Sequence, residues 1–460
     1  MTGRSTTRLQ ISGHRFLLRR MTHALVRGDV QMSDDPMRAQ ALSLITGAVL
    51  AVIGIAAAAV LAFLQPRGAL GEASIVMVRD TGALYVRIDQ TLHPVMNLAS
   101  ARLVTGSSDK PQLVSGSAVA GAQRGAMLGI PGAPDAIATP LTHAESGWTV
   151  CDDESSTTTV VVGPADELPA ARGSILVSAA GEGAAATYLL FDGRRAKVDL
   201  RNPAVVRALS LDGVAPRPLS RTVLNILPEA PEIAAPNIRD AGAPGPAPLR
   251  GVRVGTVVRV PQADSAELYV VLAGGVQRVG VVAADLIRFT QPQNAHEIAT
   301  VEPGAIGAVP VVDDLPVGQF PERSATVDDP MLCVRWRWSV AAKSVAIAAI
   351  TVDALPGRGA ASLAQADAAA AGIDRFAMSG GRSAYVRAAG VSGDGARNGS
   401  LFLVNDAGVV FGVRDEDTAE RLGLTGDPVP APWPLLARLP RGPELSIQAA
   451  SIARDALQAP

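Results

Sequence analysis

The sequence of 460 residues offers few side chains whose types and spacing would support catalysis. A nucleotide-hydrolysing phosphate loop needs glycines that let backbone amides approach phosphate, together with a Lys and a following Ser or Thr. Only Lys343 of the three lysines precedes a Ser or Thr, and the residues before it read WSVAA instead of a glycine-rich loop. The Gly-x-Ser-x-Gly motif of many hydrolases is also absent from the sequence. We therefore expect a protein without enzymatic activity.

Metal and cofactor sites are not indicated either. No pair such as His-Glu-x-x-His occurs, and two cysteines are too few for a multi-cysteine zinc site. The glycine-rich pieces at 128–134 and 393–399 do not match the dinucleotide fingerprint, which needs a strand before and a helix after. The acidic pairs Asp152–Asp153 and Asp313–Asp314 could bind a cation, but adjacent carboxylates on loops are usually only solvated. The histidines, which we expect to be structural or exposed, are His14, His23, His93, His143 and His296.

Charge and length limit the class of protein. With 41 basic and 43 acidic residues the formal net charge is -2, so no broad positive surface is available to neutralise the phosphates of a nucleic acid. The chain is too long for one compact domain and suggests two or three modules. Hydrophobic residues make up 48% of it but aromatic residues only 3%, so the apolar fraction overstates the bulky side chains available for a core.

Residues 41–64 are predicted to form a transmembrane helix. The sequence between Arg38 and Arg67 has no charged side chain. Twenty-four helical residues span about 36 Å, which is enough to cross a hydrocarbon core of about 30 Å. A buried soluble helix or a cleaved signal peptide are the alternatives, but 40 residues precede this segment and a signal peptide normally has a shorter start and a shorter apolar core.

The flanking charges predict the orientation of this helix. Arginines are concentrated before the apolar segment and scarce directly after it, so the positive-inside rule places residues 1–40 in the cytoplasm and residues 68–460 on the other side. The stretch Gly13–Val30 reads as a basic amphipathic helix, which suits anionic headgroups or a partner helix at the membrane surface; a solvated tail is the alternative. The residues expected on its apolar face are Phe16, Leu17, Met21, Leu25 and Val30.

Four stretches beyond the membrane segment resemble one another. They begin at Leu84, Thr187, Leu268 and Leu401, and each reads as a strand, a turn, a second strand and a short helix. Asn202 with Pro203 is expected to begin the second helix, and Asp417 with Glu420 to approximate a capping box in the fourth. An aromatic ring recurs at one position and is expected to pack each helix onto its hairpin, with ligand stacking as the alternative. These rings are Tyr85, Tyr188, Tyr269 and Phe402.

The insertions between these repeats carry the two cysteines. If the region beyond the membrane lies in an oxidising compartment, Cys151 and Cys333 can form a disulfide that ties the insertions into one central domain; free thiols are the alternative. The stretch from Pro228 to Pro248 is expected to be an extended surface connector. Residues 427–443 form a second proline-framed strip, whose Trp433, Leu435 and Leu436 are expected to dock on a neighbouring domain, followed by a final helix from Ser446 to Leu457.

Several long segments resemble the EccB family, a membrane component of type VII (ESX) secretion systems. The resemblance rests on ISGHRFLLRRMTHALVRGDVQMSDDPMRAQ before the apolar segment, on LGIPGAP, TTTVVVGP and GVQRVGVVAADLIRF within the chain, and on PAPWPLLARLPRGPELS near its end. Within the family the sequence looks most like the EccB of the fourth ESX system. The resemblance implies a single membrane pass, a periplasmic region, and a bridge between Cys151 and Cys333. It also implies as partners the EccC ATPase, EccD, EccE and a mycosin protease.

The sequence therefore predicts a β-rich α+β protein that acts as a structural inner-membrane component of a type VII secretion complex. A periplasmic scaffold that self-associates around the export path is the leading interpretation; a peptidoglycan-binding module and, as some family members are labelled, an ATPase are the alternatives. We expect no cofactor and no nucleic-acid partner, and contact with inner-membrane lipids. The expected parts beyond residue 67 are repeats near 72–106, 173–213, 251–290 and 380–426, a central domain from insertions near 125–170 and 300–355, and a C-terminal strip and helix over 427–460.

Overall fold

The chain is a mixed α+β protein with several β-sheets and an apolar helix near its N-terminus. The computed structural model describes residues 8–28, 36–64, 70–164, 173–180, 186–247, 249–262, 265–291, 298–322, 331–352, 355, 359–366 and 372–455. The chain divides into two compact units. The first contains residues 1–72, 78–81 and 113–121, and the second contains the remaining residues.

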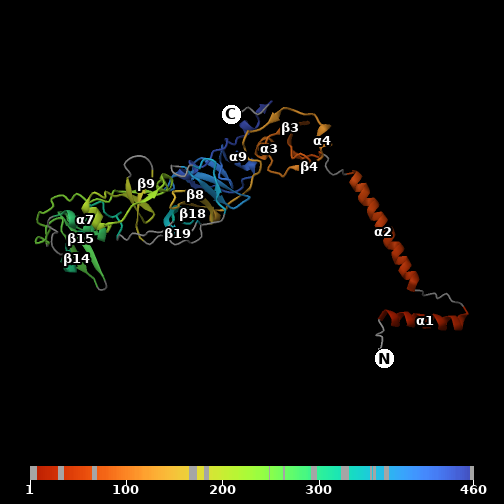
Figure 1. Cartoon of the computed structure of the whole chain (residues 1–460), viewed down its shortest axis with the longest axis horizontal. Coiled ribbons are helices and arrows are strands. Elements are labelled where there is room, and N and C mark those ends of the chain that lie inside the picture. The colour runs from red at the N-terminus through yellow and green to blue at the C-terminus, as the bar shows by residue number, and fades with distance from the viewer. Residues whose placement is uncertain are drawn as a thin grey trace. The chain divides into compact units, whose positions relative to one another are not determined.

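Two helices dominate the first unit. These are α1 (Arg8–Arg27) and α2 (Pro36–Leu64), and Figure 1 shows each as one continuous ribbon. Residues Gln40–Leu61 of α2 have a mean hydropathy of 2.6, and none of that helix surface is buried in protein. A soluble helix of this composition would bury its leucines and isoleucines, whereas Leu44 and Ile55 are at least 70% exposed. The predicted transmembrane range 41–64 lies within α2, and the structure offers one helix among its described residues that is long and apolar enough to span a bilayer.

Each of the four predicted repeats contains the expected hairpin and helix. A further strand precedes every hairpin, pairs with its first strand in antiparallel fashion, and was not foreseen from the sequence. The elements in chain order are β1 (Ile75–Val78), β2 (Leu84–Ile88), β3 (Thr91–Val95) and α3 (Leu98–Thr105); β9 (Ile175–Ala179), β10 (Thr187–Phe191), β11 (Arg194–Lys197) and α5 (Pro203–Ala208); β14 (Val257–Pro261), β15 (Ala266–Leu272), β16 (Gly275–Val279) and α7 (Val281–Thr290); and β22 (Arg382–Ala389), β23 (Leu401–Asn405), β24 (Val410–Val413) and α9 (Glu416–Leu422).

In the last three repeats the chain returns after the helix as a short strand parallel to the first strand. The return strands are β12 (Arg217–Leu219), β17 (Ala299–Thr300) and β25 (Val429–Pro432), which pair with β9, β14 and β22. A parallel neighbour needs a crossover connection, and the helix of the repeat supplies it. The repeat is therefore a three-stranded meander, a helix and a returning strand. The limits of the repeats and of the central domain given above stay a prediction.

The helices of the repeats pack in pairs. Leu103 of α3 and Leu422 of α9 share one buried cluster, so the first repeat packs on the fourth. Val205 of α5 and Leu286 of α7 share another, so the second repeat packs on the third. The first pair also has a polar link, because Arg102 donates from Nη1 to the carbonyl oxygen of Leu422 at 2.6 Å.

A six-stranded sheet, here called the central sheet, is formed by the parts of the chain between the first and second repeats and between the third and fourth repeats. Its order is β19-β18-β7-β8-β21-β20, and Figure 1 shows β8, β18 and β19 together in it although they come from distant parts of the chain. Trp148 on β7 and Trp336 on β18 stand opposite each other and are fully buried. Their cluster also contains residues of the second and fourth repeats, which therefore share a core with this sheet. The strands are β7 (Gly147–Asp152), β8 (Thr158–Gly163), β18 (Met331–Ser339), β19 (Ser344–Val352), β20 (Ala361–Ser362) and β21 (Arg375–Met378).

The helix caps agree with the sequence in one place and differ in another. Asn202 caps α5 and Pro203 is its first residue, as predicted. The capping box at Asp417 and Glu420 is wrong, since Asp415 is the N-cap of α9 and accepts a hydrogen bond from the backbone of Thr418. The sequence prediction took an acidic residue within the first turn of α9 for its cap, so the predicted start of the helix lay two residues too late.

The predicted surface connector and the final helix also need correction. Past Pro228, β13 (Glu229–Ala230) pairs with β11, and Ile233 and Ile238 are buried, so the described part of the connector packs into the cores of the second and third repeats. The predicted C-terminal helix is only α11 (Ile447–Ala450). The chain then forms β26 (Ala453–Arg454), which pairs with β5 (Met127–Leu128). Pro248 and the end of the predicted helix at 456–457 lie outside the described residues.

The prediction for the C-terminal strip is right for its leucines and wrong for its tryptophan. Leu435 and Leu436 of α10 (Trp433–Leu436) are fully buried in the cluster that also contains Trp148 and Trp336. Trp433 instead remains 42% exposed, where its ring lies 5.8 Å from the ring of Phe402 and 5.1 Å below the guanidinium of Arg441. A bulky ring can be covered by neighbours on one side while the other side stays in water.

Candidate functional site in the central sheet and the basic helix

Cys151 and Cys333 are joined by a disulfide within the central sheet. They stand directly opposite each other on the antiparallel strands β7 and β18, and both are buried. The bridge closes a separation of 182 residues. It therefore cross-links two insertions that lie on either side of the second and third repeats, as the sequence predicted.

Asp152 continues β7 beyond the disulfide and is fully buried. Its carboxylate accepts hydrogen bonds from the hydroxyl of Thr158 at 2.8 Å and from the backbone N–H of Ser220 at 2.6 Å, and a third from the Ser220 hydroxyl. Ser220 is the N-cap of α6 (Arg221–Asn225), which follows the second repeat. Burial raises the pKa of Asp152 above its ordinary value, and the hydrogen bonds from Ser220 and Thr158 oppose that shift. Asp152 was expected to be solvated, so that expectation is wrong.

Glu145 lies at the other end of β7, in the short helix His143–Glu145. Its carboxylate accepts two hydrogen bonds from the guanidinium of Arg382 on β22, at 2.7 and 3.2 Å. The backbone N–H and the hydroxyl of Thr142 donate to it as well, both at 2.9 Å. These bonds, led by those from Arg382, lower the pKa of Glu145 to about 2. Glu145 thus attaches the central sheet to the fourth repeat through a charged pair.

The residues with possible chemistry are not brought together. Lys343 occupies the turn between β18 and β19 with a φ of 49°, and a strand follows it instead of the helix that a phosphate loop requires. His93 donates a hydrogen bond from Nδ1 to the carbonyl oxygen of Ala126 at 2.9 Å, and His143 is exposed in its short helix. In the part of the chain that the structure describes, no group of three or more His, Cys, Asp or Glu could hold a metal ion. His296 lies outside that part.

The glycine-rich and acidic pieces have structural roles. In the segment 128–134, the carbonyl of Ile130 accepts from Asn97 and its N–H donates to Ser100, which fixes the first turn of α3. Asp153 accepts from Ser155 and Thr157 in a turn. In the second acidic pair, Asp313 accepts a hydrogen bond from the Gln277 side chain.

The recurring aromatic rings do not pack the helices onto the hairpins. In the second repeat, Leu189 and Phe191 face α5, whereas Tyr188 between them packs against the core of the central sheet. Phe402 likewise lies in the core of the central sheet, while its neighbours Leu401 and Leu403 pack with α9. Successive side chains of a strand point to opposite faces of the sheet. The ring therefore marks the face away from the helix, and that prediction is wrong.

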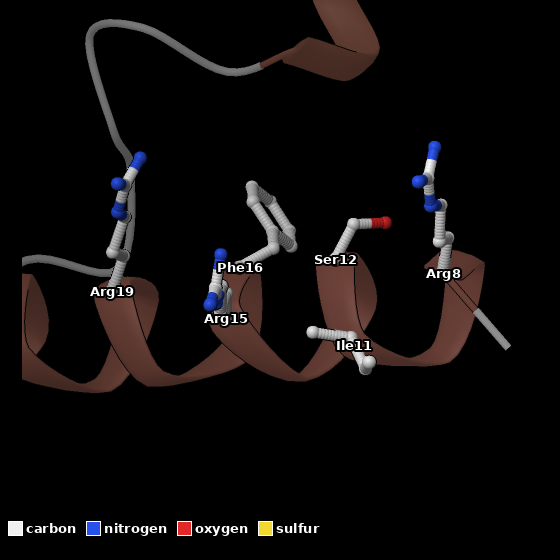
Figure 2. A pocket seen from close by; sticks show the side chains of 6 residues that line it. All are labelled: Arg8, Ile11, Ser12, Arg15, Phe16 and Arg19. Atoms are coloured by element: carbon white, nitrogen blue, oxygen red, sulfur yellow. The ribbon is translucent and has the colours of Figure 1, made fainter. Parts of the chain in front are cut away.

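The basic helix α1 differs in one detail from the predicted amphipathic pattern. Its side chains form a groove of about 440 Å³, and Figure 2 shows Phe16 rising from α1 between Arg19 and Ser12, with Arg15 next to it. Phe16 thus lies among the arginines and not with Leu17, Met21 and Leu25. Val30, the fifth residue predicted for the apolar face, lies outside the described residues. The lining residues are Arg8, Ile11, Ser12, Arg15, Phe16 and Arg19.

Known proteins are similar to this chain over nearly its full length. The family described as "Type VII secretion system ESX-1, transport TM domain B" matches residues 3–459. The "ESX-3 secretion system ATPase EccB3" of Mycolicibacterium smegmatis is 35% identical, over 98% of this chain and 91% of the relative. Among solved structures, a chain of the periplasmic assembly from the ESX-5 inner membrane complex is 33% identical with a TM-score of 0.69, over 86% of this chain and 100% of the other.

A second solved structure, the EccB3 dimer from the ESX-3 core complex, is 31% identical with a TM-score of 0.71, over 83% of this chain and 100% of the other. The family match extends over residues 3–459, and both solved structures share the fold at more than 30% identity. This chain therefore belongs to the EccB family of type VII secretion systems.

Proposed function

We propose that this chain is a structural, non-enzymatic component of an ESX inner-membrane complex, anchored by α2 with its N-terminus in the cytoplasm. The observation that carries the proposal is an apolar helix of membrane-spanning length in the same chain as a large body that contains a buried disulfide. Disulfides persist in oxidising compartments such as the bacterial periplasm. The arginines before α2 favour the same orientation, with residues 68–460 in the periplasm.

The periplasmic body is proposed to act as a scaffold of four repeats around the central sheet, self-associating around the export path. The solved EccB3 chain forms a dimer and the solved ESX-5 chain is part of a periplasmic assembly, and this chain shares their fold. The second and fourth repeats share a buried core with the central sheet, and the disulfide joins strands β7 and β18 of that sheet, so the body can resist or transmit force. Work for transport would come from a separate motor, for which EccC is the proposed partner, next to EccD, EccE and a mycosin.

An ATPase activity is the rival function, because the similar M. smegmatis protein bears that label. We propose that this chain does not hydrolyse ATP. Supporting this, Lys343 lies in a hairpin turn without a glycine-rich loop or a following helix. Purified full chain is expected to show no hydrolysis above a buffer control, and a rate removed by one substitution within this chain would refute the proposal.

Isolation of the complex tests the scaffold function. The full chain, tagged at its C-terminus, is extracted from membranes in mild detergent, and the composition and stoichiometry of the eluate are measured. Recovery of the EccC motor and EccD with more than one copy of this chain is expected; recovery of the chain alone would count against the scaffold. The identity of the co-purified partners also tests the proposed subtype, which is the fourth ESX system.

A reporter tests the orientation separately. Alkaline phosphatase fused after Pro460 folds and is active only where its own disulfides can form, so we expect activity. An inactive fusion, with a fluorescent protein at the same position active instead, would place the body in the cytoplasm.

A further inference from the structure

The helix α1 carries two chemically different faces that nothing in the described part of the chain covers. Its apolar side chains are exposed, from 43% for Ile11 to 84% for Leu25. A soluble protein rarely leaves such a set in water, so an exposed apolar helix face marks an interaction surface. The members of this face are Ile11, Leu17, Leu18, Met21 and Leu25.

The opposite part of α1 is positively charged, and the helix itself carries no acidic side chain. Five arginines and two histidines occur between Arg8 and Arg27, and no Asp or Glu. A helix repeats every 3.6 residues, so Arg15 and Arg19 return to within about 20° of Arg8 around the helix axis. Figure 2 shows Arg8 and Arg19 extending from the helix with Ser12 and Phe16 on the same side. The other two arginines of the helix, Arg20 and Arg27, border the apolar face on its opposite edge.

The apolar face is thus flanked by arginines on both sides. A helix that lies flat in a membrane interface needs this arrangement, because its apolar face enters the acyl region while long cationic side chains at its edges reach the phosphate level. A binding partner made of protein would have to supply acidic groups along both edges of the helix, whereas a leaflet rich in anionic lipid supplies them everywhere.

Chain length keeps α1 near the bilayer. Eight residues separate the end of α1 at Arg27 from the start of α2 at Pro36. At about 3.4 Å per residue they reach no further than about 30 Å. With α2 in the membrane, the surface most available to α1 is the leaflet that α2 enters.

We propose that α1 docks on the anionic lipids of the cytoplasmic leaflet, with Arg8, Arg15 and Arg19 binding headgroup phosphates and Leu17, Leu18 and Leu25 inserted below them. The proposal rests on the proposed orientation of α2 only for the choice of leaflet. In this arrangement the groove that Phe16 lines together with Arg8, Arg15 and Arg19 faces the headgroups. The recognised chemistry is a lipid phosphate held by several guanidinium groups at once.

The test uses the full chain in lipid nanodiscs and a dye on the apolar face. The disulfide leaves no free thiol, so Leu25→Cys can be labelled alone with an environment-sensitive fluorophore. In discs that contain phosphatidylglycerol, we expect blue-shifted emission and quenching by lipid-borne quenchers; in purely zwitterionic discs, emission typical of water. Inorganic phosphate in solution should not restore the blue shift, which distinguishes lipid headgroups from free phosphate.

Charge variants decide whether the arginines are responsible. Each cationic side chain near an anionic leaflet changes docking by about fivefold. Replacement of Arg8, Arg15 and Arg19 by Gln should therefore lower the ratio of docked to free helix by about 100-fold, and replacement of the same three by Lys should retain most of it. Gln and Lys have helix propensities close to that of Arg, so circular dichroism should not change.

Two results would overturn the proposal. One is water-like emission of the label in phosphatidylglycerol discs, with protection from a soluble quencher appearing only in the complete secretion complex, which would assign α1 to a protein partner. The other is a Gln variant that docks as well as the original. Neither result bears on membership of the complex, because co-purification measures that separately.

Discussion

The two ends of β7 carry carboxylates of opposite character. Asp152, at one end, is fully buried, lies next to the disulfide, and has a raised pKa because burial disfavours its charge. Glu145, just before the other end, is partly exposed and has a pKa lowered to about 2 by hydrogen bonds from Arg382 and Thr142. One strand therefore attaches the second repeat through a buried polar contact and the fourth repeat through a surface ion pair.

The difference in burial indicates that the attachment at Asp152 contributes more to stability than the attachment at Glu145. A buried acceptor that loses its donor keeps a desolvation cost, whereas water can replace a donor at a half-exposed acceptor. The structure places the disulfide and the buried cluster of Cys151, Cys333 and Ile350 at the Asp152 end. Disruption at that end should therefore destabilise the central sheet more than disruption at the Glu145 end.

Removal of the disulfide is expected to have the largest effect. The double variant Cys151→Ser with Cys333→Ser opens a loop of 182 residues and should lower the free energy of unfolding by about 2–5 kcal/mol. Chemical denaturation of the full chain in detergent micelles measures the change. Hydrogen exchange should rise most in β7 and β18 and least in α7 of the third repeat, which has its own core. Equal exchange in both regions would contradict the assignment of the bridge to the central sheet.

The variant Asp152→Asn is expected to cause the second-largest loss in the free energy of unfolding. The amide that replaces the carboxylate has one acceptor oxygen, so it cannot serve Ser220 N–H and the two hydroxyl donors as the carboxylate does. Loss of a satisfied buried contact costs about 1–3 kcal/mol. The matched control is Asp153→Asn, whose partly exposed side chain also accepts hydrogen bonds in a turn. A cost for the control as large as that for Asp152→Asn would show that burial does not matter here.

A feature could be predicted from the sequence when it depends on neighbouring residues, and not when it depends on residues far apart in the chain. The α2 span, the four hairpin-helix units and the cap at Asn202 follow from neighbouring residues, and the structure contains them. The return strands β12 and β17 are too short to show a period, and their pairing is set by strands far away in the sequence. Asp152 could not be told from its partly exposed neighbour Asp153, because Ser220 approaches from 68 residues away.

The same reasoning explains the error over the recurring rings. Alternation along β10 shows that Tyr188 and Leu189 face opposite sides, but it does not say which side the helix covers. The disulfide, by contrast, could be predicted from count and compartment, since two cysteines have a single possible pairing.

The pH dependence at Asp152 is a smaller effect. The folded pKa of Asp152 lies above its unfolded value, so the folded state binds its proton more tightly. The stability that this adds is fully present below about pH 4, the unfolded value, and is lost as the pH rises through the folded pKa. The gap in melting temperature between the original chain and Asp152→Asn should therefore narrow as the pH rises. A gap that widens instead would mean that hydrogen bonds to the charged form outweigh its burial.

The smallest expected effect is at Glu145, and it has the opposite sign. Its folded pKa of about 2 lies below the unfolded value, so its contribution to stability is present above about pH 4 and is lost as the pH falls toward 2. In Glu145→Gln the melting temperature should fall less steeply between pH 5 and 2.5 than in the original chain. Because Arg382 is the main cause of the shift, Arg382→Gln should flatten the same part of the curve, and the double variant should resemble either single one. Additive flattening would mean that the two side chains act apart, and that the ion pair does not hold the fourth repeat to β7.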